Sequence, residues 1–234
     1  MAADELCGGI PEADAAGAPS ARFTLCGREW NVLRGDMETL WNEMDSFTDP
    51  DDERLPYWAE LWPSSLALAE WLTDNGGLIA GKRCLDLGCG LGFTAMAGAA
   101  AGALVTGGDY EERAIDLARR NAVVNGFAEN GYPVFRHLDW REPAMPPHAF
   151  SFVWAADILY ERKAAREVLD FLDVALPDDG IAWIAEPGRT IFNAFSDLIA
   201  SSPFAMRTVR SVRTKSLSPN IPAATVNIRE LRRH

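Results

Sequence analysis

The sequence predicts an α/β fold, a mostly parallel seven-stranded sheet with helices on both faces that ends in an antiparallel hairpin. Three observations lead to this expectation. From residue 83 onward, short apolar runs alternate with helical patterns, as in parallel strands joined by crossover helices. A glycine-rich turn follows the first apolar run, as at a ligand-binding βα junction. The last two strand-like runs are joined by a Pro-containing loop, which favours a hairpin.

The region before this alternation has weaker signals. Residues 23–32 alternate loosely between apolar and polar, and we expect a hairpin around Cys26 and Gly27. Residues 36–44 indicate a short helix. Residues 61–72 indicate a clearer one, because Pro63 suits a first helical turn and apolar residues recur at helical spacing behind it.

From residue 83 onward, the change in the spacing of apolar residues distinguishes the expected strands from the expected helices. Residues 111–125 show the clearest helix, because Ala114, Ile115 and Ala118 share one face and Gly126 follows as a stop. We expect strands at residues 83–87, 103–108, 133–138, 150–156 and 181–185, further helices at 93–101, 164–176 and 190–200, and the final strands at 206–214 and 224–231.

The chain has 234 residues, and we expect three parts. Residues 1–20 are rich in Ala, Gly and acids without a basic start or an apolar centre, which predicts a disordered leader and not a secretory signal. Residues 21–75 are expected to form an N-terminal extension that caps the site of the α/β domain at 76–234. No apolar run approaches the roughly 20 residues of a membrane span, so no membrane partner is expected.

Composition narrows the class further. The net charge of −12 argues against a nucleic-acid backbone as the main partner. The four cysteines are scattered without a Cys-x-x-Cys pair, so we expect no metal site, no disulfides and a cytoplasmic location. We also expect a monomer. Charge is uneven, with an acidic segment at 36–60 and a basic tail at 207–233. These are either solvated surfaces or, for the acidic one, a face for a basic substrate.

The strongest motif is the glycine-rich turn at residues 85–92, which spells Gly-x-Gly-x-Gly through Gly88, Gly90 and Gly92. The dinucleotide fingerprint places its third glycine one residue later. Asp86 also puts a carboxylate where a pyrophosphate would be held. S-Adenosylmethionine has no phosphate and carries an ammonium and a sulfonium, so an acid-led loop suits it better. The alternative is a tight turn without a ligand.

Acids end the next two strands. Asp109 lies roughly 20 residues past the loop, where an acid accepts hydrogen bonds from both ribose hydroxyls. Its alternative role is a helix N-cap. Tyr110 is expected against the adenine face. Asp139 is expected to accept a hydrogen bond from the adenine amino group, beside Trp140, or else to be an ordinary turn residue next to a packed Trp.

The fourth strand ends in Asp157, followed three residues later by Tyr160. Ligands of parallel sheets bind beyond the carboxyl ends of the strands, near the point where strand order reverses, so Asp157 should face the bound cofactor. The alternative is a helix cap with a packed Tyr160. Trp58 and Trp62 stand four apart just before the α/β domain, a spacing typical of core aromatics that also allows them to roof the pocket.

Residues 55–190 resemble a class I, seven-β-strand, Rossmann-like S-adenosylmethionine-dependent methyltransferase. More narrowly, the Trp62-Pro63-Ser64 segment, the Asp139-Trp140 pair and Asp157-x-x-Tyr160 resemble the family of protein lysine methyltransferases marked by an Asp-x-x-Tyr motif, often called family 16. The first fifty residues and the basic tail share no such resemblance.

The resemblance implies specific roles and a substrate class. It implies cofactor binding by Gly88, Gly90, Gly92, Asp109 and Asp139, and an acceptor side at Asp157 and Tyr160. Known substrates of such enzymes are lysines on particular proteins, including the beta subunit of electron transfer flavoprotein. We therefore expect methyl transfer to an exposed lysine of a protein partner. The alternatives are a small-molecule N- or O-methyltransferase and a non-catalytic binding module. Asp157 is expected to attract and orient the amine, and Tyr160 to close the methyl channel.

Overall fold

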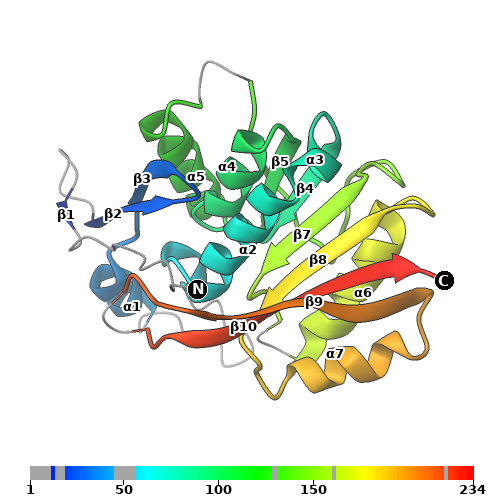
Figure 1. The fold of residues 1–234 in the computed structure, drawn as a ribbon. Coiled ribbons are helices and arrows are strands. Elements are labelled where there is room, and N and C mark those ends of the chain that lie inside the picture. The colour runs from blue at the N-terminus through cyan, green and yellow to red at the C-terminus, as the bar shows by residue number, and fades with distance from the viewer. Residues whose placement is uncertain (1–11, 14–18, 45–55, 128–130, 160–161, 219–220) are drawn as a thin grey trace.

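The computed structural model describes residues 12–13, 19–44, 56–127, 131–159, 162–218 and 221–234. Its centre is a seven-stranded sheet in the order β6-β5-β4-β7-β8-β10-β9 (Figure 1). The strands are β4 Arg83–Leu87, β5 Leu104–Asp109, β6 Val134–His137, β7 Phe152–Ala156, β8 Ile181–Glu186, β9 Phe204–Thr214 and β10 Ala224–Arg233. Strands β4 to β8 pair in parallel, and β10 pairs antiparallel with both β8 and β9. The predicted fold class is confirmed.

Strand β4 marks the point where the sheet reverses its order. It pairs with β5 on one side and with β7 on the other, so the chain leaves it in opposite directions. All six residues of β8 are buried, as expected of a strand covered on both faces. The crevice beyond the carboxyl ends of β4, β5 and β7 is therefore where this topology places a ligand.

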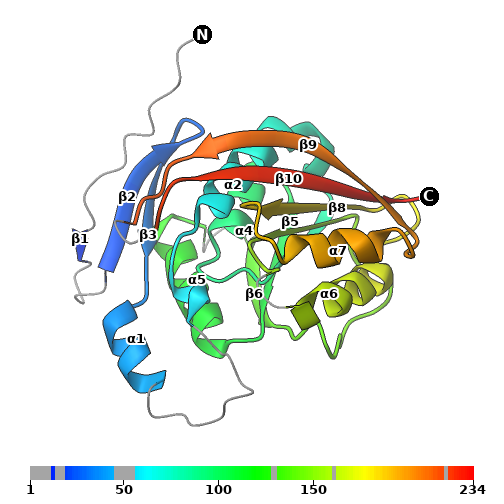
Figure 2. The ribbon, with the colours of Figure 1, turned by 90° about the horizontal axis from the view of Figure 1, so that it is seen from below.

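Helices cover both faces of the sheet (Figures 1 and 2). Helices α2 (Pro63–Asp74), α4 (Phe93–Ala100) and α5 (Glu112–Val124) contribute to one hydrophobic cluster, and α6 (Arg162–Ala175) and α7 (Phe192–Ile199) contribute to the other. The small residues of α4 allow close packing. A Cβ on Gly98 would stand 2.5 Å from the Trp154 ring, so this helix can approach the sheet only with glycine there.

A second, three-stranded sheet lies beside α5. It consists of β1 Glu12–Ala13, β2 Pro19–Leu25 and β3 Arg28–Leu33, and α1 Met37–Met44 follows it. Cys26 and Gly27 have φ of 54° and 72°, the positive values that a two-residue hairpin turn requires, so the hairpin expected around this pair is confirmed. The rings of Phe23 and Trp30 meet Phe93 edge-on at 5.5 and 5.1 Å, which ties the hairpin to the first turn of α4.

The structure differs from the sequence-based boundaries at several ends. The second strand of the sheet extends to Asp109, and the third and fourth are shorter than expected. A 3-10 turn, η1 Tyr57–Ala59, and the short helix α3 Gly76–Ile79 were not predicted. Most of the expected leader and much of the acidic segment, at residues 45–55, lie outside the described residues, and the division into domains stays a prediction. Within the described residues, no helix combines the length and apolar character needed to cross a membrane.

Candidate active site

A cavity lies at the carboxyl ends of β4, β5 and β7. Its wall comes from the segment before α2, from the glycine-rich loop, and from the ends of the parallel strands. The residues are Tyr57, Trp58, Glu60, Leu61, Trp62, Ser65, Gly88, Cys89, Gly90, Leu91, Phe93, Thr94, Asp109, Tyr110, Trp140, Ala156, Asp157, Ile158 and Arg189. Segments that are distant in the sequence thus meet at the place that the strand order predicts.

The glycine-rich loop forms the floor of this cavity. Gly88 and Gly90 have φ of 65° and 48°, in the left-handed region that favours glycine. A Cβ would stand 2.7 Å from Ile158 at Gly88 and 3.0 Å from the Trp58 carbonyl oxygen at Gly90. Gly92 does not line the cavity. A Cβ there would collide with α5 and β6, so this glycine supports the loop from behind.

Asp109 joins the loop to the end of β5. Its Oδ2 accepts a hydrogen bond from the Gly90 N–H at 2.9 Å, and its Oδ1 accepts one from the Glu111 N–H at 3.0 Å. Burial raises the pKa of this carboxyl to about 6. A carboxylate oxygen accepts two hydrogen bonds, so each oxygen keeps a site for a ligand hydroxyl. Asp109 is thus held in place by the backbone and presented to the cavity.

Asp86 lies beneath the loop and does not line the cavity. Its Oδ2 accepts a hydrogen bond from the Thr94 hydroxyl at 2.6 Å, and its Oδ1 has no hydrogen-bond partner within the described part of the chain. Burial raises the pKa of Asp86 to about 7. The side chain points to the first turn of α4, and a role of Asp86 in cofactor binding stays a prediction.

Two aromatic rings stand at the β5 side of the cavity. Tyr110 and Trp140 meet edge-on with ring centroids 6.3 Å apart, and the Trp140 Nε1–H donates to Glu167 at 3.3 Å. Asp139 is not among the lining residues. Both of its oxygens accept hydrogen bonds from Arg141, whose proximity holds the pKa of Asp139 below its usual range. The structure therefore brings Trp140 to the cavity and leaves Asp139 outside it.

Asp157 and Arg189 form a fork at the β7 side. Arg189 Nε donates to Asp157 Oδ1 at 2.9 Å, and Nη2 donates to Oδ2 at 3.3 Å. The Asp157 side chain is 7% exposed and its φ is 59°, a left-handed conformation that Asp tolerates better than most residues. The guanidinium also lies 5.8 Å from the centre of the Trp62 ring. Arg189 is not among the site residues predicted from the sequence. Its position three residues after the carboxyl end of β8 is the signal that could have indicated it.

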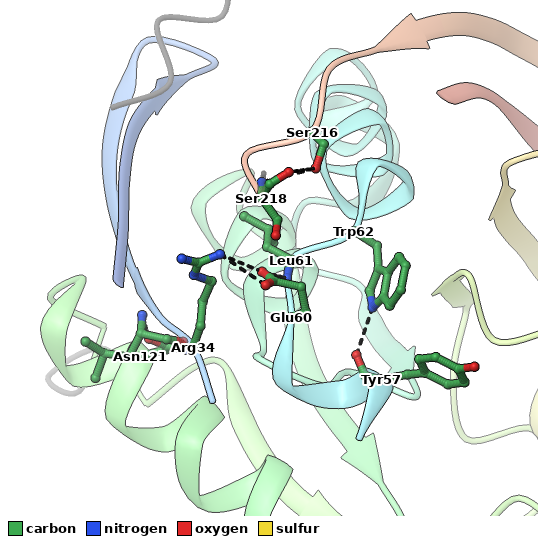
Figure 3. A network of polar contacts seen from close by, with 9 residues as sticks. Arg34, Tyr57, Glu60, Leu61, Trp62, Asn121, Ser216 and Ser218 are labelled. Atoms are coloured by element: carbon green, nitrogen blue, oxygen red, sulfur yellow. Dashed lines mark hydrogen bonds and ion pairs between the residues drawn. The ribbon is translucent and has the colours of Figure 1, made fainter. Parts of the chain in front are cut away.

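The segment before α2 contributes Tyr57, Glu60 and Trp62 to the cavity wall, and Figure 3 shows the polar contacts that these residues make. The Trp62 Nε1–H donates to the Tyr57 carbonyl oxygen at 2.8 Å. Glu60 accepts hydrogen bonds from the Leu61 N–H at 2.8 Å and from Arg34 at 3.0 and 3.1 Å. The Arg34 and Glu60 side chains are both buried, so this ion pair fastens the roof to the end of the hairpin.

Asn121 of α5 fastens the same hairpin from the other side. Its Oδ1 accepts from the Leu33 N–H at 2.7 Å, and its Nδ2 donates to the carbonyl oxygens of Leu33 and Leu91, both at 3.0 Å. Leu91 belongs to the glycine-rich loop and lines the cavity. One buried amide therefore connects the hairpin, α5 and the loop, a role that no sequence pattern indicated.

Charged side chains from three sides line the cavity wall. They are the carboxylates of Glu60, Asp109 and Asp157 and the guanidinium of Arg189. Arg34 binds Glu60 and Arg189 binds Asp157, whereas the Asp109 oxygens are held by backbone N–H groups. No cluster of metal-ligating side chains occurs in the part of the chain that the structure describes.

The model of the lysine methyltransferase family matches residues 52–185, more than half of the chain. The chain belongs to the lysine methyltransferase family. This membership confirms the enzyme class that the sequence predicted, and S-adenosylmethionine as its methyl donor.

Relatives of this lysine methyltransferase include proteins named electron transfer flavoprotein beta subunit lysine methyltransferase. The one from Xenopus laevis is 31% identical over 173 residues, which cover 73% of this chain and 68% of that protein. The one from Danio rerio is 38% identical over 155 residues, which cover 65% of this chain and 57% of that protein.

A solved structure shares the fold. It is magnesium protoporphyrin IX methyltransferase from Synechocystis, with a TM-score of 0.58 and 18% identity, and the match covers 85% of this chain and 92% of that one.

The structure of this lysine methyltransferase gathers most of the predicted site residues. Those that line the cavity are Trp62, Gly88, Gly90, Asp109, Tyr110, Trp140 and Asp157. Asp86, Gly92 and Asp139 do not line it, and Tyr160 lies outside the described residues. Strand-end position predicts where a residue lies better than it predicts which way its side chain points.

Proposed function

We propose that this lysine methyltransferase transfers the methyl group of S-adenosylmethionine to a lysine of a protein, the beta subunit of electron transfer flavoprotein being the first candidate. One observation carries the proposal. A single aromatic-walled cavity holds the carboxylates of Asp109 and Asp157 on either side of β4, one suited to a ribose and the other to an amine. The names of the frog and zebrafish relatives support the choice of acceptor.

The residues on the β5 side would hold the cofactor. Asp109 would accept hydrogen bonds from the ribose hydroxyls, and Tyr110 and Trp140 would pack against the adenine. The loop glycines allow the methionine part to lie against the backbone. The bound cofactor supplies a methyl group already activated by a sulfonium, so the protein provides no nucleophile of its own. Its contribution is alignment of donor and acceptor, which is worth about 7–11 kcal/mol in well-oriented reactions.

The residues on the β7 side would hold the acceptor. A lysine attacks only as a neutral amine, and at pH 7 deprotonation from a pKa of about 10.4 costs about 4.6 kcal/mol. The nearby sulfonium and the loss of solvent both lower the lysine pKa. Asp157 orients the amine through its oxygens, whereas its charge taken alone would favour the ammonium.

The test is a methylation assay with labelled S-adenosylmethionine. The purified protein is incubated with the beta subunit of electron transfer flavoprotein and, separately, with an extract of its source cell. Mass spectrometry then locates any label. A methylated lysine on a protein is expected. Label found only on a small molecule would indicate the alternative N- or O-methyltransferase. Cofactor binding without any transfer would indicate a binding module.

The remaining features of this proposal concern the state of the enzyme. We propose a monomer that acts in the cytoplasm and does not bind nucleic acid. The scattered cysteines, which form no Cys-x-x-Cys pair in the sequence, support this compartment. Size-exclusion chromatography with light scattering checks the oligomeric state, and cell fractionation checks the compartment.

A further inference from the structure

The acceptor side of the cavity contains a matched pair of charges instead of a lone carboxylate. Arg189 covers both oxygens of Asp157 with a fork of hydrogen bonds. If Asp157 served only to attract the lysine ammonium, a guanidinium bound to its carboxylate would weaken that attraction. The Asp157–Arg189 ion pair therefore indicates a different role for Asp157.

We propose that Arg189 neutralises Asp157, so that the acceptor side offers hydrogen-bond acceptors to the target lysine without the negative charge that would hold it as an ammonium. The inference rests on the proposed function and deepens it. Arg189 is a positioning residue in this scheme, because it acts on the amine through Asp157. The amine N–H groups donate to the Asp157 oxygens, and the neighbouring guanidinium disfavours an additional positive charge.

The surrounding groups do not provide this neutralisation. Glu60 lines the same cavity, but its carboxylate is bound by Arg34. Glu186 at the end of β8 is bound by Arg229 at 2.7 Å, and it also accepts from the Gly188 N–H, which fixes the loop that carries Arg189. Tyr57 lines the cavity and faces Arg189. Tyr160 and Glu161 lie outside the described residues.

The fork is held by more than its two charges. Partial burial works against the charged form of Arg189, yet the hydrogen bond and the charge of Asp157 raise the pKa of the guanidinium above its ordinary value. The Trp62 ring packs beside it. Arg189 stays cationic over the whole pH range in which the enzyme can be assayed, so any titration seen in turnover belongs to another group.

The test separates a lysine-tuning role from a structural one. Arg189→Gln and Arg189→Lys are compared with Arg166→Gln, which removes an exposed guanidinium on α6 that does not line the cavity. For each protein, kcat and KM for the beta subunit of electron transfer flavoprotein are measured from pH 6 to 10. Calorimetry at pH 7 gives the affinity for the same substrate with S-adenosylhomocysteine bound.

The inference predicts opposite changes in binding and turnover. In Arg189→Gln, the acidic limb of the pH profile of kcat should move up by about one pH unit. We expect a shift of this modest size because Arg189 is partly exposed. Turnover at pH 7 should fall about tenfold and recover near pH 9, while the substrate binds about threefold more tightly, since the uncovered carboxylate attracts the ammonium. Arg189→Lys should keep the wild-type limb, and Arg166→Gln should match wild type throughout.

Four results would overturn the inference. An unmoved limb in a folded Arg189→Gln protein would leave Arg189 a structural residue, as would weaker substrate binding together with lower kcat. A limb shifted equally in Arg189→Lys would mean that the fork geometry, and not the charge, matters. A wild-type enzyme that methylates no lysine would remove the proposed function, and this inference with it, whereas an active wild type isolates the failure to Arg189.

Discussion

Asp109 is prepared for a ligand by the backbone around it, because the Gly90 and Glu111 N–H groups hold both of its oxygens. Asp109→Ala should weaken binding of S-adenosylmethionine and S-adenosylhomocysteine more than tenfold, since a buried charge-assisted acceptor is lost and the loop loses its anchor. Calorimetry measures the change. Asp116→Ala, at an exposed carboxylate on α5, is the matched control and should bind as wild type does. An unchanged affinity in Asp109→Ala would refute the ribose assignment.

Asp157 should matter for transfer and much less for holding the cofactor. Asp157→Asn keeps the size of the side chain and leaves Arg189 as an uncompensated cation beside the acceptor. We expect near-complete loss of methylation, with cofactor affinity changed only a few-fold. Asp170→Asn, on the exposed face of α6, serves as the control. If Asp157→Asn keeps most activity, the carboxylate serves only to hold the loop. If it abolishes cofactor binding, Asp157 belongs with the cofactor residues.

Sequence position predicted that Asp109 and Asp157 would lie at the site, and both line the cavity, whereas two other candidate acids do not. The carboxyl ends of parallel strands share one edge, so Asp109 and Asp157 follow from the strand pattern alone. Asp86 lies inside its strand, where alternation turns its side chain toward α4. Asp139 forms an ion pair with Arg141, two residues later in the chain. The position of Asp139 after a strand does not predict this local contact. Arg189 lies in an irregular loop, and only the fold shows that it reaches β7.

At the scale of elements, the N-terminal hairpin is fastened to the active site by buried polar groups. Asn121→Ala would leave the Leu33 N–H and the carbonyl oxygens of Leu33 and Leu91 without this partner. We expect a loss of roughly 2–4 kcal/mol in the free energy of unfolding, measured in urea, since each unsatisfied buried group is costly. Asn193→Ala, at an exposed position on α7, should change it by less than about 0.5 kcal/mol.

The same substitution tests whether the hairpin supports the cofactor loop. Because Asn121 also holds Leu91, cofactor affinity should fall a few-fold in Asn121→Ala at a temperature where the protein is still folded. Calorimetry on the folded variant checks this. Full affinity together with reduced stability would show that the loop does not depend on this contact.

Element prediction succeeded where a period had room to repeat. The helix α5 is long enough for apolar residues to recur, the parallel strands were marked by apolar runs between helical patterns, and the hairpin turn was marked by Cys26-Gly27. The missed elements β1, η1 and α3 have 2, 3 and 4 residues, too few for any periodicity. Their conformations are set by contacts with the rest of the fold, such as the approach of the Trp58 carbonyl to Gly90.

At the scale of the whole molecule, several cations of the basic tail form ion pairs with acids of other elements. Arg207 binds Glu230 at 2.7 Å, Arg210 binds Asp74 at 2.8 Å, and Arg233 binds Asp173 at 2.6 Å. These three arginines of the basic tail therefore pair with acids of α2, α6 and β10.

Two buried carboxyls give the molecule an unusual dependence of stability on pH. Burial raises the pKa of Asp86 to about 7 and that of Asp109 to about 6, both from an ordinary value of 3.8. At pH values between 3.8 and these raised pKa values, the native state retains protons that the unfolded chain has released. The free energy of unfolding therefore falls as pH rises, until the native groups have also ionised.

Substitution of Asp86 isolates the larger of these two contributions. For a native pKa near 7, the wild-type free energy of unfolding should drop by about 2–3 kcal/mol between pH 5 and pH 8 through Asp86. Asp86→Asn keeps the shape and cannot ionise, so its stability should fall with pH by correspondingly less, the remaining slope coming from Asp109. Urea denaturation at both pH values measures the difference. Asp197→Asn, at an exposed position on α7, should parallel wild type. Parallel curves for wild type and Asp86→Asn would mean that Asp86 is ionised in the native state at pH 5, which its burial and its unpaired Oδ1 argue against.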